Sequence, residues 1–478
     1  MFDVIIVQER VQICGVHKRR RKEDNNKRKR FKNKKGGITV QRIKWFLVFS
    51  LIFMVFTLAA CGNEESASTT SGGKVELLYM THTPENATQQ KIIETEVIGA
   101  FEKAHPNISI KWIHNEDPVT LIRQQMAAGA GPDIVLVDGP TQIMQFAKSD
   151  YLLPLNKFAE KHGWNDRYFD WAYKTGFVGD ELYGLPAQYE SLVVWYNKDL
   201  FKEKGWEEPT TFDEFMKLNK EVQKEGLIPF AFGTTDFRPA NEWWLSVVYN
   251  SYLGTEEMKK VLKNETPWTN DLITEATTQW KDIWQEGYIN EKKSHAISGD
   301  DAWSLFRNEQ AVMKMEGTWA TATLTTEPTS FETDFFVMPG WRDGVKPTLP
   351  IALGESAGIN AKTKHPEEAA VFLDWLFSDE VGSIMFDQGY FYPNKAIEPS
   401  TEAEPIVLKV HEELNKSFEE GDPGFASWTY WGPNVQYYLW DNIDKVFLDQ
   451  MSVKDYLKEA QKNAEKDEAE GLLFNFED

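Results

Sequence analysis

Cysteine is scarce in this chain of 478 residues: only Cys14 and Cys61 are present, and the body after residue 61 has none. That body therefore cannot hold a disulfide, a thiolate nucleophile or a cysteine-ligated metal. The seven histidines after Cys61 include no pair four residues apart and no H-E-x-x-H motif, so no zinc-ligand set is visible. We expect no metal and no cofactor, and stability from packing alone.

Positive charge is concentrated at the N-terminus and is sparse elsewhere. Residues 1–60 hold 15 Lys and Arg against 4 Asp and Glu, which leaves 37 basic and 70 acidic residues at 61–478, a formal charge of −33. A body of that sign repels phosphate backbones and anionic membrane surfaces. Nucleic acid is thus excluded as the expected partner, despite the basic run at 17–35.

The sequence also lacks an apolar run long enough to span a bilayer. The sixteen uncharged residues from Trp45 to Ala60 fall short of the roughly 20 that a membrane helix needs. With Arg42 and Lys44 before it and small residues at its end, this run is typical of an export signal. An N-terminal anchor that is never cleaved is the alternative interpretation.

The residues Leu58-Ala59-Ala60-Cys61 resemble the lipobox of bacterial lipoproteins. The resemblance implies that residues 1–60, a basic leader and signal peptide, are removed and that Cys61 carries lipid such as palmitate. We expect translation to begin near Val40. The polar stretch 61–73 is typical of a flexible tether. The body is thus expected at the extracellular face of the cytoplasmic membrane of a Gram-positive bacterium.

Strand and helix patterns alternate from residue 74 onward. Apolar strand patterns at 75–80, 108–113 and 133–137 are separated by helical patterns at 88–103 and 119–128. This order is typical of βαβ units, which predicts an α/β first lobe with a parallel sheet.

Further helices follow in the second half of the chain. Thr211 and Glu214 have the spacing of a capping box, in which Glu214 reaches back to the Thr211 amide. Apolar periodicity predicts helices at 212–224, 271–286, 300–309, 366–377, 403–417, 434–449 and 453–467. No repeat of 20–50 residues is visible, which argues against a solenoid or propeller.

Two glycine motifs imitate enzyme signatures. Residues 354–358 (GESAG) match the G-x-S-x-G nucleophile elbow, but no helix pattern starts at Ser356, as that turn requires. Gly129 and Gly131 precede a strand instead of following one, so they indicate a turn and not a dinucleotide site. No catalytic residue is assigned, although a glycosidase-type carboxylate pair stays open among 70 acidic residues.

Tryptophan, by contrast, is plentiful, with seventeen residues after Cys61. Several stand beside polar or turn residues instead of in apolar stripes: Trp243, Trp303, Trp319, Trp428 and Trp431. A pyranose ring offers an apolar face on which indole can stack and a rim of hydroxyls that carboxylates can bond. As a set, these tryptophans indicate an aromatic groove for a sugar.

Six segments match one known group of proteins in the same order along the chain. They are AAGAGPDIVLVD (127–138), YGLPAQYESLVVWYNKDLF (183–201), PTTFDEF (209–215), LFRNEQAVMKMEGTW (305–319), SAGINAKTKHPEEAAVFLDWL (356–376) and SVKDYLKEAQ (452–461). Together they resemble the family 1 extracellular solute-binding proteins of bacterial ABC importers, the group that contains maltodextrin-binding protein. The resemblance implies a two-lobed α/β fold, periplasmic-binding-protein-like, that closes on its ligand like a flytrap.

The resemblance also implies the organisation and the function. The implied parts are lobe 1 at 74–188 and 354–400, lobe 2 at 189–353 and 401–478, and crossing strands near Tyr189–Trp195 and Leu349–Gly354. A monomer of this family captures a carbohydrate between the lobes and hands it to the membrane permease, without chemistry on the ligand.

Site residues follow position by position from the resemblance. Glu190 matches a carboxylate that bonds sugar hydroxyls in the maltodextrin protein, and Trp319 matches its stacking tryptophan. Asp138 stands at the C-terminal end of its strand, where open α/β sheets place ligands. Val137 replaces an aromatic of the maltodextrin protein, which argues against maltodextrin itself. The other ligand-binding candidates are Thr81, His82, Tyr189, Asp236, Trp243, Trp303, Glu355, Trp428 and Trp431.

Three other functions fit the same residue types. An exported carbohydrate-active hydrolase would turn its ligand over, and a chemosensory or regulatory sensor would pass it to a receptor instead of a permease. A structural surface protein would show no ligand-dependent stabilisation. Import is the function that we expect.

Overall fold

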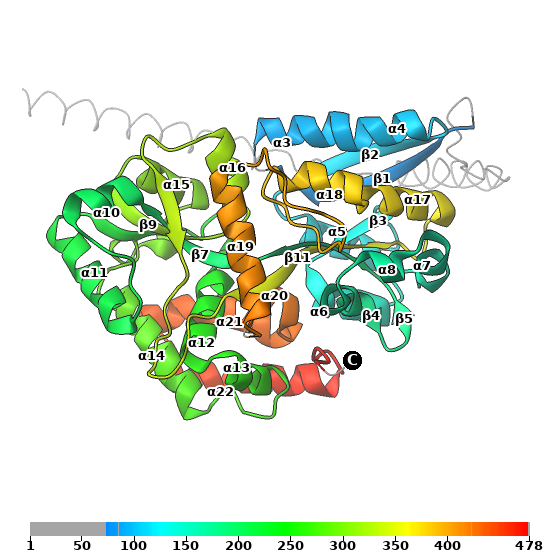
Figure 1. The fold of residues 1–478 in the computed structure, drawn as a ribbon. Coiled ribbons are helices and arrows are strands. Elements are labelled where there is room, and N and C mark those ends of the chain that lie inside the picture. Colours follow the sequence, from blue (N-terminus) through cyan, green and yellow to red (C-terminus); the bar gives the residue numbers. More distant parts are fainter. Residues whose placement is uncertain (1–72, 85, 422, 477–478) are drawn as a thin grey trace, which may run out of the picture. The chain divides into compact units, whose positions relative to one another are not determined.

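The computed structural model describes residues 73–476 apart from 85 and 422, and these belong to one compact unit of the chain. The expected signal run, the lipid-bearing Cys61, the start near Val40 and nearly all of the tether lie outside the described residues. Within the described part, no helix has the length and apolar character needed to cross a membrane. Two separate sheets, each with its own helices, organise this unit (Figure 1).

The first sheet has six strands in the order β12-β11-β3-β1-β2, with β6 paired to β11. Its members are β1 (Val75–His82), β2 (Ile108–Asn115), β3 (Ile134–Val137), β6 (Leu185–Glu190), β11 (Pro350–Ile359) and β12 (Gly424–Phe425). Strands β1, β2 and β3 run parallel, whereas β11 runs antiparallel to β3 and β6. The parallel βαβ arrangement predicted from the apolar runs is thereby confirmed.

The helix predicted at 88–103 exists as three consecutive pieces. These are α3 (Ala87–Ile92), a π-helical segment (Ile93–Ile98) and α4 (Gly99–Ala104). The other helices near this sheet are α5 (Pro118–Ala127), α6 (Gly139–Lys148), α7 (Asn156–His162), α8 (Trp164–Arg167), α9 (Asp170–Tyr173), α17 (Pro366–Leu376) and α18 (Asp379–Phe386). A 3₁₀ turn (Lys174–Gly176) leads into a small hairpin of β4 (Phe177–Val178) and β5 (Glu181–Leu182).

The second sheet has four strands in the order β10-β7-β9-β8. Its members are β7 (Leu192–Asn197), β8 (Ile228–Ala231), β9 (Ala311–Gly317) and β10 (Thr333–Phe336). The remaining helices are α10 (Lys198–Lys204), α11 (Phe212–Lys224), α12 (Asn241–Leu253), α13 (Thr255–Leu262), α14 (Asp271–Gln285), α15 (Gly299–Arg307), α16 (Ala320–Thr326), α19 (Pro405–Glu419), α20 (Ser427–Tyr430), α21 (Pro433–Phe447) and α22 (Val453–Ala469). Short 3₁₀ turns occur at Arg238–Ala240, Asn290–Lys292 and Ser294–Ala296.

The chain passes from the first sheet to the second at Ser191, the single residue between β6 and β7. Its backbone N–H donates to Thr318 Oγ1 at 3.2 Å, and its hydroxyl donates to the carbonyl of Pro350 at 3.0 Å. Pro350 begins β11 and Thr318 directly follows β9, so these two bonds tie the passage between the sheets to both strands. The lobe boundaries given above stay a prediction.

The helices predicted from periodicity all exist, and their ends agree within two residues. One detail of the predicted capping box is wrong. Thr211 accepts from the Glu214 amide at 3.2 Å as expected, but Glu214 accepts from the amide of Thr210 at 2.9 Å and not from that of Thr211. The Glu214 side chain also bonds the Thr210 hydroxyl at 2.7 Å, which draws it one residue further back.

The nucleophile-elbow reading fails on geometry, as expected. Ser356 is fully buried inside β11, and the strand continues to Ile359 without turning into a helix. Gly129 and Gly131 lie between α5 and β3 and have positive φ angles of 79° and 126°, so they form a turn that leads into a strand.

Candidate functional site

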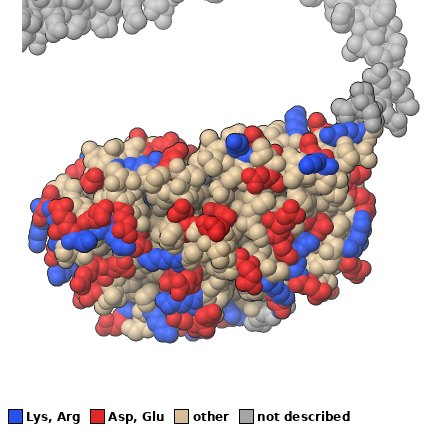
Figure 2. Space-filling model, turned by 45° about the horizontal axis from the view of Figure 1, so that its top comes forward, with Lys and Arg blue, Asp and Glu red and all other residues tan. Residues whose placement is uncertain are grey.

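A cavity of about 700 Å³ is lined by residues of both sheets. Strands β1, β6 and β11 bring polar side chains to it from the first sheet, and β9 and α12 bring charged and aromatic ones from the second part. Carboxylate side chains also gather in the middle of the face drawn in Figure 2. The cavity therefore combines acidic and aromatic walls.

Glu190, the last residue of β6, lines the cavity, and both oxygens of its carboxyl group accept hydrogen bonds. Gln188 Nε2 donates to its Oε2 at 2.8 Å, and Trp428 Nε1 donates to its Oε1 at 3.3 Å. Burial and the nearby charge of Glu355 raise the pKa of Glu190 to about 8, although the two hydrogen bonds oppose this shift. At neutral pH the group is mostly a neutral acid, which can donate as well as accept hydrogen bonds.

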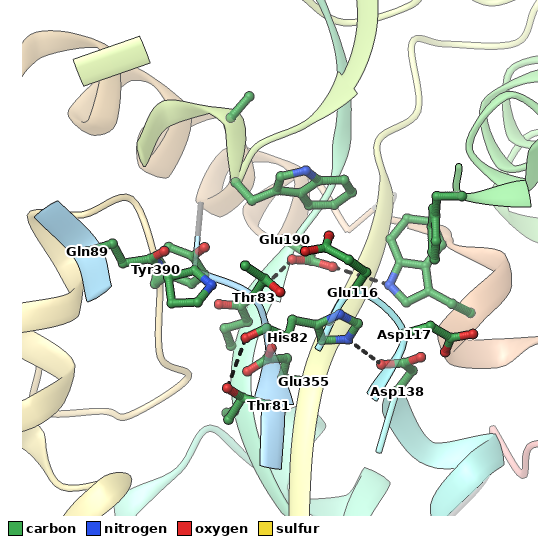
Figure 3. A pocket seen from close by; sticks show the side chains of 18 of the residues that line it. Thr81, His82, Thr83, Gln89, Glu116, Asp117, Asp138, Glu190, Glu355 and Tyr390 are labelled. Atoms are coloured by element: carbon green, nitrogen blue, oxygen red, sulfur yellow. Dashed lines mark hydrogen bonds and ion pairs between the residues drawn. The ribbon is translucent and has the colours of Figure 1, made fainter. Parts of the chain in front are cut away.

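His82 at the end of β1, Asp138 directly after β3 and Glu355 in the middle of β11 lie together on three neighbouring strands (Figure 3). The ring Nε2 of His82 is 3.6 Å from Asp138 Oδ1. Burial lowers the pKa of His82, but the bond to Asp138 and the charges of Asp138 and Glu355 outweigh burial and raise this pKa to about 9. His82 is thus a cation held among carboxylates, and burial raises the pKa of Glu355.

Trp243, Trp319 and Trp428 form an aromatic wall of the same cavity. The ring centroids of Trp243 and Trp319 are 5.4 Å apart at 63°, and those of Trp319 and Trp428 are 6.2 Å apart at 74°. Trp243 and Trp319 are only partly buried, and all three line the cavity. Since Trp428 also bonds Glu190, the aromatic wall and the carboxyl wall meet at this residue.

A buried ion pair lies in the part of the wall that β9 supplies. Lys314 Nζ and Glu316 Oε2 are 2.6 Å apart, and the two side chains are 2% and 6% exposed. The ammonium also lies 4.7 Å from the ring centroid of Trp303, which lines the same cavity. Pairing offsets much of the cost of burying either charge.

Glu242, near the start of α12, is a second buried acid in the wall. Gln436 Nε2 and the hydroxyl of Ser427 donate to its Oε2 at 2.7 and 2.9 Å. Burial nevertheless raises its pKa to about 8. The cavity thus holds two carboxyl groups that are mostly protonated at neutral pH.

Ten of the twelve predicted ligand-binding residues line this cavity. They are Thr81, His82, Asp138, Glu190, Asp236, Trp243, Trp303, Trp319, Glu355 and Trp428. The structure brings these side chains together from nine separate segments of the chain. That each one contacts a ligand stays a prediction.

Tyr189 does not face the cavity, contrary to the expectation. Side chains alternate along a strand, so Tyr189 points to the opposite side of β6 from Gln188 and Glu190. Its ring packs at a centroid distance of 5.9 Å from Trp171, and its hydroxyl donates to Asn415 at 3.2 Å.

Trp431 is also removed from the candidate set. Its side chain is fully buried, and its ring packs at centroid distances of 5.8 Å from Tyr249 and 5.2 Å from Trp268. Polar neighbours in the sequence misled the assignment, because α20 ends at Tyr430 and the chain turns there into the core.

Several polar wall residues were missed from the sequence: Gln89, Glu116, Asp117, Gln188, Glu242, Lys314 and Glu316. Two of them had a visible signal. Lys314 and Glu316 are charged residues two apart in an otherwise apolar strand pattern, and buried charges require partners. Gln188 shares the face of Glu190 by the same spacing, whereas nothing local marked Glu242.

This arrangement can bind a polyhydroxylated ring. Neutral and ionised carboxyl groups, a cationic imidazole and an amide offer donors and acceptors to hydroxyl groups, while indole rings offer apolar faces. Among the described residues, no group of three or more His, Cys, Asp or Glu side chains could hold a metal ion.

Residues 82–383 match the family model described as bacterial extracellular solute-binding protein. A multiple sugar-binding protein of Streptococcus mutans is 28% identical over 346 residues, which cover 70% of this chain and 79% of that protein. Among solved structures, a chitin oligosaccharide binding protein has a TM-score of 0.74 at 22% identity and covers 83% of this chain and 100% of its own. A solute-binding protein in complex with raffinose has a TM-score of 0.68 at 21% identity, with coverages of 82% and 100%. These likenesses confirm the expected two-lobed α/β fold.

Proposed function

Because this chain belongs to the bacterial extracellular solute-binding proteins, we propose that it captures an oligosaccharide in the cavity and delivers it to the permease of an ABC transporter. The observation that carries this proposal is the wall formed by Trp243, Trp319 and Trp428, which meets the Glu190 carboxyl group through the Trp428 indole. Stacking rings beside hydroxyl-bonding carboxyls are the complement of a pyranose.

The size of the cavity fits a short oligosaccharide. Its volume of about 700 Å³ falls within the roughly 300–1,000 Å³ usual for small-molecule sites. The names of similar proteins point to the same ligand class, since they bind sugars or chitin oligosaccharides.

The charge of the cavity favours an uncharged sugar over an acidic one. Among the described lining side chains, the cations His82 and Lys314 each lie beside a carboxylate partner, Asp138 and Glu316. Neither is therefore free to receive a uronate or phosphate group. We therefore expect the ligand to be a neutral oligosaccharide.

The mechanism is a population shift between open and closed forms. A ligand that contacts both parts of the site binds more tightly to the closed form, in which these parts are close together. This difference in affinity shifts the population toward the closed form. The passage at Ser191 is where the two parts would rotate. Chemistry on the ligand is not required, so the protein acts as a binding protein and not as an enzyme.

The N-terminal features complete the proposal. Lipid on Cys61 would hold the monomer at the extracellular face of the membrane, where the permease is. Labelled palmitate should be incorporated into the wild-type protein and not into Cys61→Ser, and equal labelling of the two would contradict the anchor.

Isothermal titration calorimetry against neutral and acidic oligosaccharides of two to six units tests the function. The expected result is saturable binding of a neutral member, which chromatography then recovers intact. Cleavage of the ligand would make the protein a hydrolase, and absence of binding across the panel would remove sugar from the proposal. A sensor would bind the sugar equally well, so uptake of the same sugar is measured in a strain that lacks this chain. Loss of uptake supports import, and unchanged uptake supports a sensor.

A further inference from the structure

We propose that Gly317 and Gly354 are positioning residues of the site, because the space left by their missing side chains is occupied by the Trp319 indole and the Glu190 carboxyl group. The effect on ligand binding rests on the proposed function, whereas the effect on the position of the indole does not.

Gly317 lies directly beneath the indole of Trp319. A Cβ atom at Gly317 would overlap the indole atoms Cζ3, Cε3 and Cη2. The backbone there has little freedom to retreat, since Gly317 pairs with Leu192 in the sheet and its carbonyl accepts from Trp195 Nε1 at 3.2 Å. A side chain at this position would therefore displace the indole.

Two neighbouring rings restrict the sideways movement of the Trp319 indole. Its neighbours Trp243 and Trp428 stand at 63° and 74° to it, at centroid distances of 5.4 and 6.2 Å. Moving Trp319 sideways pushes one of these two rings, and both line the cavity. The closely packed aromatic wall thus depends on the glycine behind it.

Gly354 has the same relation to Glu190. A Cβ atom there would overlap the carboxyl carbon and both oxygens of Glu190. The pairing of β11 with β6 is irregular between Leu353 and Glu355, so Gly354 occupies the irregularity itself. Glycine within a strand often marks a bulge or a close approach of another group, and here the group is a site carboxyl.

Backbone conformation does not explain either glycine. Neither Gly317 nor Gly354 has a φ angle in the positive region that other residues avoid. The reason for glycine at both positions is therefore the space that a neighbouring side chain takes up. The two cases differ in stiffness, because the indole is a rigid ring while a carboxyl group ends a flexible chain.

Alanine at each position tests the proposal, with Gly299 as the matched control. A Cβ atom at Gly299 would meet its nearest atoms, the Asp236 carboxylate oxygens, at ordinary distances of 3.7 and 3.9 Å. We expect Gly317→Ala and Gly354→Ala each to lower affinity for the sugar found by calorimetry about tenfold. Gly299→Ala should lower it much less, because Gly299 lines the same cavity but a Cβ atom there overlaps no neighbour. Gly354→Ala should lower the melting temperature less than Gly317→Ala does, since the flexible Glu190 side chain can move aside and loses only its bonds to Gln188 and Trp428.

Double variants separate displacement from general damage. Gly317→Ala should cause no further loss in a Trp319→Ala background, and Gly354→Ala none in a Glu190→Ala background. If Gly317→Ala melts early, the added Trp319→Ala change should restore the melting temperature, because the clash is then removed. Full additivity of the losses, or no restoration, would overturn the proposal.

A readout without ligand keeps the test independent of the proposed function. The emission of Trp319, obtained as the difference between proteins with and without Trp319→Ala, should shift in wavelength or quenching when Gly317→Ala is present. An unchanged difference spectrum would overturn the proposal for Gly317 even if a sugar binds. A changed spectrum with no sugar bound by the wild type would support it while refuting the proposed function.

Discussion

Folding changes the protonation of Glu190 by raising the pKa of its carboxyl group. Its pKa is raised from 4.5 to about 8, so the folded protein binds a proton that the unfolded chain has released. Stability therefore falls as pH rises from about 5 to about 8. Glu190→Gln should flatten this fall when the free energy of unfolding in urea is measured at pH 5, 6.5 and 8.

Other groups set the size of that change. The pKa of Glu242 is raised to about 8, so its contribution to the stability of the protein is lost over the same pH range. The pKa of His82 is raised from 6.5 to about 9, so its contribution is lost between these two pH values. Both remain in the variant, so the slope should decrease and not vanish. An identical slope in Glu190→Gln would show that Glu190 is already ionised in the folded protein.

Trp319 and Trp431 offer a comparison within one residue type. Trp319→Ala removes a partly buried cavity ring and should weaken sugar binding by about 2 kcal/mol, or about 30-fold. Trp431→Phe alters a fully buried core ring and should lower stability by about 2 kcal/mol while affinity is unchanged. Calorimetry and thermal melting distinguish the two. Equal effects of both variants on affinity would contradict the placement of the site.

Single residues were predictable where chemistry and position agreed. Glu190 and Asp138 followed from the resemblance and from strand ends, and the structure places both in the cavity wall. Tyr189 failed because strand alternation turns it away from its neighbour. Trp431 failed because polar neighbours in sequence do not reveal which way a short helix turns. Glu242 was out of reach, since its site is assembled by distant segments.

At the scale of elements, caps decide helix stability without touching the site. Thr211 caps α11, whose buried residues Phe215, Leu218 and Val222 face the core and not the cavity. Thr211→Ala should lower the free energy of unfolding by about 1 kcal/mol. Thr278→Ala, at an exposed position inside α14, should be neutral or slightly stabilising. Urea titration of both variants checks this, and equal losses would contradict a capping role.

Elements were predictable wherever one face is exposed. The helix at 212–224 was found in full because its apolar and charged faces alternate with the helical period. By contrast α12 (Asn241–Leu253) was not expected as a helix, since twelve of its thirteen residues are buried and no polar face marks the period. The π-helical segment Ile93–Ile98 leaves no signal in the sequence pattern either.

At the scale of the whole described unit, several side-chain contacts join its two parts, and those of Asn86 and Arg123 are among them. Asn86 Nδ2 donates to the carbonyl of Ala322 at 3.3 Å, and Arg123 donates to the hydroxyl of Tyr437 at 3.3 Å. The Arg123 guanidinium also lies 5.5 Å from the centre of the Tyr437 ring. Both contacts link segments beside the first sheet to helices beside the second. In the proposed mechanism, we expect them to break when the two parts separate.

Arg123→Ala should therefore shift the population toward the open form. A loss of about 1 kcal/mol lowers sugar affinity roughly fivefold and increases the radius of gyration of the ligand-free protein in small-angle scattering. Arg342→Ala is the matched control, since Arg342 lies 5.9 Å from the ring of Tyr252 and bonds its carbonyl within the second part. Equal scattering and equal affinity for the two variants would contradict a role of the Arg123–Tyr437 contact in holding the two parts together.

A tryptophan-fluorescence titration with oligosaccharides, repeated on the Glu190→Ala, Trp319→Ala double variant, tests the central claim most directly. Five tryptophans line the cavity (Trp112, Trp243, Trp303, Trp319 and Trp428), so a bound sugar must alter their surroundings. The expected result is a saturable change with one neutral oligosaccharide that chromatography recovers intact, and no change in the double variant. Silence across the panel, or an equal response from the double variant, would contradict a sugar site in this cavity.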